Sequence, residues 1–418
     1  EASARQGSPL VRALDHKLVR DLWRLKGQML TIALVVAAGI AAFVTLRGTY
    51  TSIQEARAAY YERQRFGDVF AGLERAPSSL LSRIEQVPGV SRADGRVVEP
   101  AMMPLPEVAE PLRALVISVG DEELQTLNRL HLRDGRWLEP GRSDEVLLLE
   151  SFAVARQVRP GDQLPVVLNG KKRDVRVAGI VMSPEYVFAI AADEVAPDPA
   201  RFAVMWIGEA ALAAAFRMEG AFNSLSVKLQ PGASERAVID ALDRLLEPYG
   251  CVGAYGAGRQ PSNWAIDGEI AQLESFSTIL PVIFLLVAAL LVNVVLSRLV
   301  HLQRPEIATL KALGYSDWEV GLHFFQLVLA ILVLGAGTGV GVGAYFGDVM
   351  VDLYSTYFKF PNLAFTFDGK SASAAVLVSV FSALVGAFGA VRGVVALPPA
   401  EAMRPPAPAR YRRSVIDI

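Results

Sequence analysis

The stretch RLVHLQRPEIATLKALGY, Arg298–Tyr315, decides how this chain is organised, because it is a short polar segment between two long apolar runs. The runs are Ser277–Leu296 and Val320–Phe346. A helix needs about 20 apolar residues to cross the hydrocarbon of a bilayer. We therefore expect two membrane helices, joined by this segment on one side of the membrane.

The joining segment carries the signals of a small helix of its own. Pro305 and Glu306 suit its first turn, and Gly314 suits the position just past its end. Apolar residues recur inside it at helical spacing: Ile307, Leu310 and Leu313. The following SDWE, Ser316–Glu319, fits a capping box that opens the next helix. From spacing alone, a docking helix and an ordinary connector remain equally open.

Composition excludes several classes of protein. Of 418 residues 52% are apolar, and the formal net charge is −2, so no basic excess indicates nucleic-acid binding. The apolar residues are concentrated in a few runs, as in a membrane protein with a polar domain. Cys251 is the single cysteine, so neither an internal disulfide nor a cysteine metal cluster can form.

Four membrane spans are predicted, at about 28–46, 277–299, 320–346 and 371–395. The N-terminal segment, the 298–319 loop and the tail after Arg392 are basic, which places both termini in the cytoplasm and 47–276 outside. Residues 1–27 form either an amphipathic helix at the membrane surface or the start of a long first helix.

The third span carries a packing signal. Glycines recur at successive i+4 positions, at Gly335, Gly339, Gly343 and Gly347. Such a stripe lets another helix approach closely in lipid. A merely flexible span is the alternative.

The large insertion between the first two spans predicts a folded α+β domain. Thr51–Gln64 should continue the first span outward as a helical stalk. Asn169-Gly170 lies between two strand patterns, which predicts a hairpin with a tight turn. The cations after this turn, Lys171, Lys172 and Arg173, fit a solvated tip better than an anion site. Ser234 should cap a helix over Glu235–Leu246.

No catalytic chemistry is evident in the chain. Gly369-Lys370-Ser371 resembles the end of a phosphate loop, but the earlier glycine that such a loop needs is Ala364. Neither HExxH nor GxSxG occurs. We expect no catalytic, cofactor-binding or metal site, and an energy source on a separate protein.

Several motifs resemble one known family. PEIATLKALGYS (Pro305–Ser316) and LPPAEAMRP (Leu397–Pro405) resemble FtsX-like, MacB-type ABC transporter permeases. YYERQRFGDVFAG (Tyr60–Gly72) and SPEYVFAI (Ser183–Ile190) look most like the first half of large permeases with two such units. The resemblance implies a helical membrane protein with four transmembrane helices and an α+β extracytoplasmic domain, a porter-like αβ subdomain carrying a β-rich insert at about 120–220. The expected divisions are 1–27, 28–46, 47–276, 277–299, 300–319, 320–346, 347–370, 371–395 and 396–418.

In that family the 300–319 segment is the coupling helix that touches the cytoplasmic ABC ATPase, where ATP and Mg²⁺ are bound. The resemblance implies these contact residues: His301, Arg304, Glu306, Ile307, Leu310, Lys311, Leu313, Gly314 and Tyr315. A second permease unit is also implied, as a homodimer, a homologous chain or the second half of a longer chain.

The implied function is export or extraction of a hydrophobic or lipid-linked substrate at the bacterial inner membrane, with lipid as a further partner. The alternative is an FtsX-like mechanical regulator of an extracytoplasmic partner such as a cell-wall hydrolase. An ATP-independent receptor is a third possibility, which predicts no ATPase partner.

Overall fold

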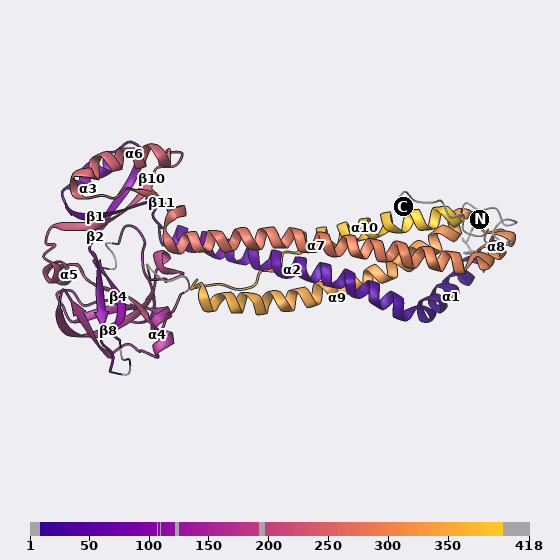
Figure 1. Cartoon of the computed structure of the whole chain (residues 1–418), viewed down its shortest axis with the longest axis horizontal. Coiled ribbons are helices and arrows are strands. Elements are labelled where there is room, and N and C mark those ends of the chain that lie inside the picture. Colours follow the sequence, from indigo (N-terminus) through magenta and orange to yellow (C-terminus); the bar gives the residue numbers. More distant parts are fainter. Residues whose placement is uncertain (1–8, 107, 109, 122–124, 192–196, 396–418) are drawn as a thin grey trace, which may run out of the picture. The chain divides into compact units, whose positions relative to one another are not determined.

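The structure, a computed structural model, describes residues 9–106, 108, 110–121, 125–191 and 197–395. These residues form two compact units (Figure 1). The helical unit holds the chain up to Thr49, Leu273–Met350 and the chain from Phe365 onward. The α+β unit holds Tyr50–Gln272 and Val351–Ala364. The motif Leu397–Pro405 lies outside the described residues.

Long apolar helices dominate the helical unit. The helices that contribute to it are α1 (Pro9–Arg24), α2 (Lys26–Arg63), α7 (Pro261–Leu302), α8 (Arg304–Ala312), α9 (Asp317–Tyr357) and α10 (Gly369–Val395). Within the described residues, α2, α7 and α9 are long and apolar enough to cross a membrane, and α10 holds a shorter apolar stretch, Ala372–Phe388. Large apolar side chains stay exposed along these helices, among them Leu286, Val333 and Phe381. Such faces are suited to lipid.

A break at Leu25 separates α1 from α2. Leu18, Leu22 and Leu25 pack against the apolar core of the helical unit. In the described part a separate helix therefore precedes α2, and the predicted position of this helix at the membrane surface stays a prediction. Its leucine side lies on the protein's own core, while Trp23 remains exposed.

The glycine stripe of α9 lies against α2. A Cβ added at Gly339 would stand 2.8 Å from the carbonyl oxygen of Ala37, and one at Gly343 would stand 2.8 Å from Val44 Cβ. Gly347 makes room for the ring of Phe365 instead. The structure thus has a close helix approach at Gly335, Gly339 and Gly343, and it is a contact within the chain.

The first sheet of the α+β unit is antiparallel and four-stranded, in the order β11-β1-β10-β2. Its strands are β1 (Val69–Pro77), β2 (Val90–Arg96), β10 (Ala221–Leu229) and β11 (Tyr255–Gly256). Helices α3 (Leu80–Glu85) and α6 (Glu235–Leu246) bury Leu80, Ile84 and Leu242 in the core of this subdomain. The predicted cap of α6 is confirmed, because Ser234 Oγ accepts a hydrogen bond from the N–H of Ala237.

The second sheet closes on itself. Its order is β5-β8-β6-β9-β4-β3-β7, and β7 also pairs with β8, so six strands form a barrel and β5 extends one edge of β8. The strands are β3 (Val98–Met103), β4 (Leu112–Val119), β5 (His131–Gly135), β6 (Glu145–Leu149), β7 (Gln163–Leu168), β8 (Lys171–Met182) and β9 (Phe202–Gly208). Helices α4 (Glu150–Arg156) and α5 (Glu209–Phe216) pack on it. Asn169 and Gly170 have φ of 46° and 76°, which confirms the tight β7–β8 hairpin.

Two predicted boundaries are wrong. The β-rich insert begins near Val98 and not near 120, because β3 and β4 belong to the barrel. Only Val97 separates β2 from β3, so the chain passes between the two sheets without a loop. The predicted 347–370 loop is helical as far as Tyr357, because the acidic residues after Phe346 end the apolar run and not the helix.

Candidate coupling site

Helix α8 has the local structure that its sequence predicts. Pro305 lies in the first turn, where its missing N–H costs no hydrogen bond. Gly314 follows the helix with φ of 100°, a conformation that side chains with a Cβ rarely adopt. The N–H of Gly314 donates to Lys311 O and that of Tyr315 to Leu310 O, which satisfies carbonyls at the helix end.

The predicted capping box at the start of α9 is confirmed. The N–H of Ser316 donates to Glu319 Oε2 at 2.8 Å, and the N–H of Glu319 donates to Ser316 Oγ at 3.3 Å. Ser316 Oγ also donates to Glu319 Oε2 at 2.8 Å. The two bonds that Glu319 Oε2 accepts from Ser316 hold the pKa of Glu319 below its ordinary value, so the carboxylate stays charged beside the positive end of the helix dipole. Lys311 of α8 also pairs with Asp317 at 2.6 Å.

The predicted contact residues divide into buried and exposed sets. Ile307 and Tyr315 are buried in the core of the helical unit, and Leu310 packs against it. The prediction that the Tyr315 side chain contacts the ATPase is therefore wrong, because its ring lies in the protein's own core. Arg304 and Lys311 are half-buried, whereas His301, Glu306, Leu313 and Gly314 are exposed.

Three large apolar side chains remain exposed at and next to the ends of α8. Leu302, Leu313 and Trp318 are 70%, 68% and 74% exposed, respectively. They come from the end of α7, the end of α8 and the start of α9. Large apolar side chains so exposed beside polar ones are typical of a protein or membrane contact. We call these three residues the apolar patch.

A polar network that the sequence did not reveal holds α1 against α8 and α9. Asp21 is buried, and its Oδ2 accepts hydrogen bonds from Lys17 Nζ at 2.7 Å and from Gln303 Nε2 at 3.5 Å. His323 Nε2 lies 3.4 Å from the same oxygen. Lys17 Nζ also lies 3.0 Å from Glu306 Oε2. The spacing of Lys17 and Asp21 shows that they share a face, but no local signal indicates their partners.

The charge of Asp21 is maintained despite its burial. Burial alone would raise the pKa of this carboxyl, but the hydrogen bond and positive charge of Lys17 hold the pKa below its ordinary value. The network therefore contains a carboxylate at neutral pH. This network fixes the first turn of α8 relative to α1. The other end of α8 is fixed by the capping box and by the Lys311–Asp317 ion pair.

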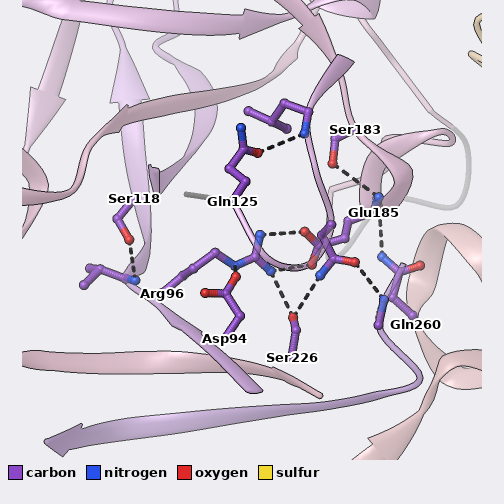
Figure 2. Close-up of polar contacts among 12 residues, drawn as sticks. Asp94, Arg96, Ser118, Gln125, Ser183, Glu185, Ser226 and Gln260 are labelled. Carbon is purple, nitrogen blue, oxygen red and sulfur yellow. Dashed lines mark hydrogen bonds and ion pairs between the residues drawn. The ribbon is translucent and has the colours of Figure 1, made fainter. Parts of the chain in front are cut away.

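A second buried network lies in the α+β unit, where it joins the four-stranded sheet to the barrel (Figure 2). Arg96, at the end of β2, binds Glu185 of the short 3-10 helix η2 (Pro184–Tyr186) through two hydrogen bonds of 2.7 Å. Arg96 Nη2 also donates to Ser226 Oγ on β10 at 3.1 Å. Gln260 Nε2 donates to the carbonyl oxygen of Glu185 at 2.7 Å.

Electrostatics keep this second network charged. Burial alone would lower the pKa of Arg96, but the carboxylate of Glu185 outweighs it and raises the pKa. Asp94 stands 3.7 Å from Arg96 Nε, and burial raises the pKa of its carboxyl. Glu185 lies in the SPEYVFAI motif, although nothing in that motif indicates Arg96 as its partner.

Comparisons with known proteins match most of the chain. Residues 29–245 match the MacB-like periplasmic core domain, and residues 278–399 match the FtsX-like permease C-terminal domain. No curated protein matches. Among solved structures, the periplasmic region of MacB from Actinobacillus actinomycetemcomitans is 13% identical, with a TM-score of 0.31, covering 49% of this chain and 92% of that one. The extracellular domain of the noncanonic ABC-type transporter YknZ from Gram-positive bacteria is 14% identical, with a TM-score of 0.30, covering 46% and 98%.

Proposed function

This chain belongs to the FtsX-like ABC transporter permeases that carry a MacB-like periplasmic core domain, and on that premise we propose that it couples a separate cytoplasmic ATPase to movement of its α+β domain. ATP and Mg²⁺ would be bound by the ATPase. Helix α8 would be the point of contact, and α2, α7 and α9 would carry the motion.

The observation that supports this proposal best is the combination of a fixed helix and an exposed apolar patch. Helix α8 is held by Lys17–Glu306 at its first turn and by Lys311–Asp317 at its last. A helix fixed at both ends transmits a push without bending locally. Leu302, Leu313 and Trp318 then offer the partner an apolar surface, which is the usual centre of a protein interface.

We further propose that α10 crosses the membrane as a fourth span, with both termini in the cytoplasm. Its apolar stretch is shorter than that of the other three helices, but the exposed apolar side chains Leu377, Phe381 and Phe388 suit lipid or a second permease unit. In a Cys251→Ser background, Asn169→Cys should react with an impermeant thiol reagent added outside intact cells, and Thr309→Cys should not. The opposite labelling would refute the cytoplasmic placement of the N-terminus and of α8.

For the substrate, we propose a hydrophobic or lipid-linked molecule, and an apolar groove supports this proposal. A groove of about 280 Å³ lies between α2, α7 and α10. Its wall includes Ile40, Phe43, Pro281, Leu285 and Val378. A groove with this lining matches an acyl chain. A regulator that carries no substrate has no need of it.

The coupling role is tested at the apolar patch. Leu313→Asp places a charge against the expected apolar surface of the ATPase. Burying an unpaired polar group should weaken the binding free energy by about a few kcal/mol. Because Leu313 is exposed, the permease itself should insert and melt like the parent. The matched control is Val252→Asp, which alters a fully exposed apolar residue of the α+β unit.

The measurement is co-purification of the ATPase from native membranes, followed by its ATP hydrolysis rate. We expect Leu313→Asp to lose binding or stimulation and Val252→Asp to keep both. Glu306→Lys and Leu310→Asp are less suitable, because Glu306 pairs with Lys17 and Leu310 packs on the core. If Leu313→Asp and Trp318→Asp both bind and stimulate like the parent, α8 is only a connector.

A further inference from the structure

An open cleft of about 810 Å³ lies in the α+β unit, where α2 and α7 meet the four-stranded sheet. Much of its wall comes from the YYERQRFGDVFAG motif, Tyr60–Gly72, which the coupling mechanism does not use. Its apolar wall includes Phe66, Leu127 and the ring of Tyr61, which stacks on Phe66 with ring centroids 4.2 Å apart.

Cations of the lining outnumber the carboxylates that neutralise them. Arg57 forms an ion pair with Asp267, and Lys228 pairs with Asp68 at 2.8 Å. The remaining charged side chains of the lining are two guanidiniums, Arg65 and Arg92, and one carboxylate, Glu62. Within the described part of the chain, neither guanidinium has a hydrogen bond or an ion pair.

The strand register brings like charges together at this wall. Arg92 on β2 stands directly opposite Lys228 on β10. Like charges at facing positions of an antiparallel pair destabilise the sheet. Lys228 Nζ also donates to the carbonyl oxygen of Phe66 at 2.8 Å. The Lys228 ammonium therefore lies beside Phe66, which is the next residue after Arg65 in the chain. Because Asp68 already pairs with Lys228, an anion in the cleft would compensate the charge of Arg92.

Arg65 occupies a position that normally belongs to glycine. It follows the end of α2 with φ of 50°, in the left-handed region. The N–H of Phe66 donates to Tyr61 O at 2.9 Å, which is the hydrogen bond of a Schellman helix end with Arg65 at the left-handed position. Glycine would fit there without strain, so an arginine at this position is less favourable for the backbone.

We propose that this cleft binds an anionic amphiphile: a phosphate or carboxylate head between Arg65 and Arg92, with its apolar body against Tyr61, Phe66 and Leu127. Guanidinium groups donate paired hydrogen bonds that match both kinds of head. Two buried polar atoms of lining residues, Tyr61 Oη and Asn263 Oδ1, also lack hydrogen-bond partners among the described residues. The proposal does not depend on the role of α8.

The test uses the full chain in phosphatidylcholine nanodiscs. Binding of dioctanoyl phosphatidylglycerol is measured by calorimetric titration, beside dioctanoyl phosphatidylcholine and inorganic phosphate. Arg92→Gln should weaken phosphatidylglycerol binding about tenfold to a hundredfold, the effect of losing a hydrogen bond between charged groups. Arg65→Gly should weaken it similarly without lowering the melting temperature, because glycine suits the left-handed position. The matched control is Arg173→Gln, at the exposed hairpin tip.

Selective binding of phosphatidylglycerol that both cleft variants weaken, and that Arg173→Gln leaves unchanged, supports the proposal. Equal affinity for inorganic phosphate overturns the proposal that the ligand is an amphiphile, because the apolar wall then contributes nothing to binding. Absence of binding, or equal binding by all three variants, overturns the site itself. Co-purification of the ATPase with the same variants should be unchanged, so failure here is distinguishable from failure of the coupling proposal.

Discussion

His323 of α9 and Asp21 of α1 lie within hydrogen-bonding distance, with Nε2 3.4 Å from Oδ2, although 302 residues separate them. The same carboxylate binds Lys17, which in turn binds Glu306 of α8. The N-terminal helix therefore belongs to the proposed coupling site, because it holds the helix that is expected to meet the ATPase.

Asp21→Asn should destabilise the helical unit by about 3 kcal/mol, because removing one charge of a buried pair leaves the other uncompensated. The measurement is the melting temperature of the purified full chain, with Arg20→Gln on the exposed side of α1 as the control. The pKa of Asp21 is lower in the folded state than in the unfolded chain. The stability that the Asp21 carboxylate contributes is therefore fully present above the ordinary aspartate pKa, and it is lost as the pH falls through the folded pKa. If Asp21→Asn melts like Arg20→Gln at pH 7, the network does not hold α1.

Gly339→Leu should separate α9 from α2, because its Cβ would lie 2.8 Å from the carbonyl oxygen of Ala37. Extra atoms forced into a packed contact cost about 1–3 kcal/mol. Gly341→Leu, two residues away, is the control, since nothing lies within 4 Å of its added Cβ. Melting temperatures of both variants are compared; equal values would mean that the glycine stripe has no packing role.

Arg96→Met and Glu185→Gln should each destabilise the α+β unit by about 3–5 kcal/mol, because either change leaves a buried charge without its partner. The double variant should cost less than the sum of the two single variants, since neither charge is then left without its partner. Arg133→Met is the control, because Arg133 pairs with Glu150 at an exposed position, where such a pair contributes about 1 kcal/mol or less. The free energy of unfolding in denaturant gives all four values. Strictly additive losses would show that the two residues act independently.

Asp94→Asn should stabilise the protein at pH 7. Burial raises the pKa of this carboxyl, and Glu185 and Glu209 add to the rise while Arg96 opposes it. The folded state thus binds the proton more tightly than the unfolded chain, so stability falls as the pH rises above the ordinary aspartate pKa. The gain in melting temperature should shrink as the pH is lowered toward that range. The exposed Asp240→Asn should show no such gain, and a gain that is constant with pH would contradict the argument.

The sequence by itself determined the local structure of this protein. Pro305 and Gly314 bound α8, Ser316 and Glu319 cap α9, Asn169-Gly170 turns the hairpin, and Ser234 caps α6. Each signal acts within one helical turn or one β-turn, through a backbone conformation or a hydrogen bond between near neighbours, so it can be recognised without knowing the rest of the fold.

Only the tertiary structure decided which faces meet. Periodicity shows that Tyr315 follows an amphipathic helix, but not that its ring enters the core, and it shows Lys17 and Asp21 on one face, but not that His323 completes the network. The pairing of Arg96 with Glu185, and the position of Arg92 opposite Lys228, likewise depend on strand order and register. These contacts join residues far apart in the chain, and the free energy that selects them arises only when the elements pack.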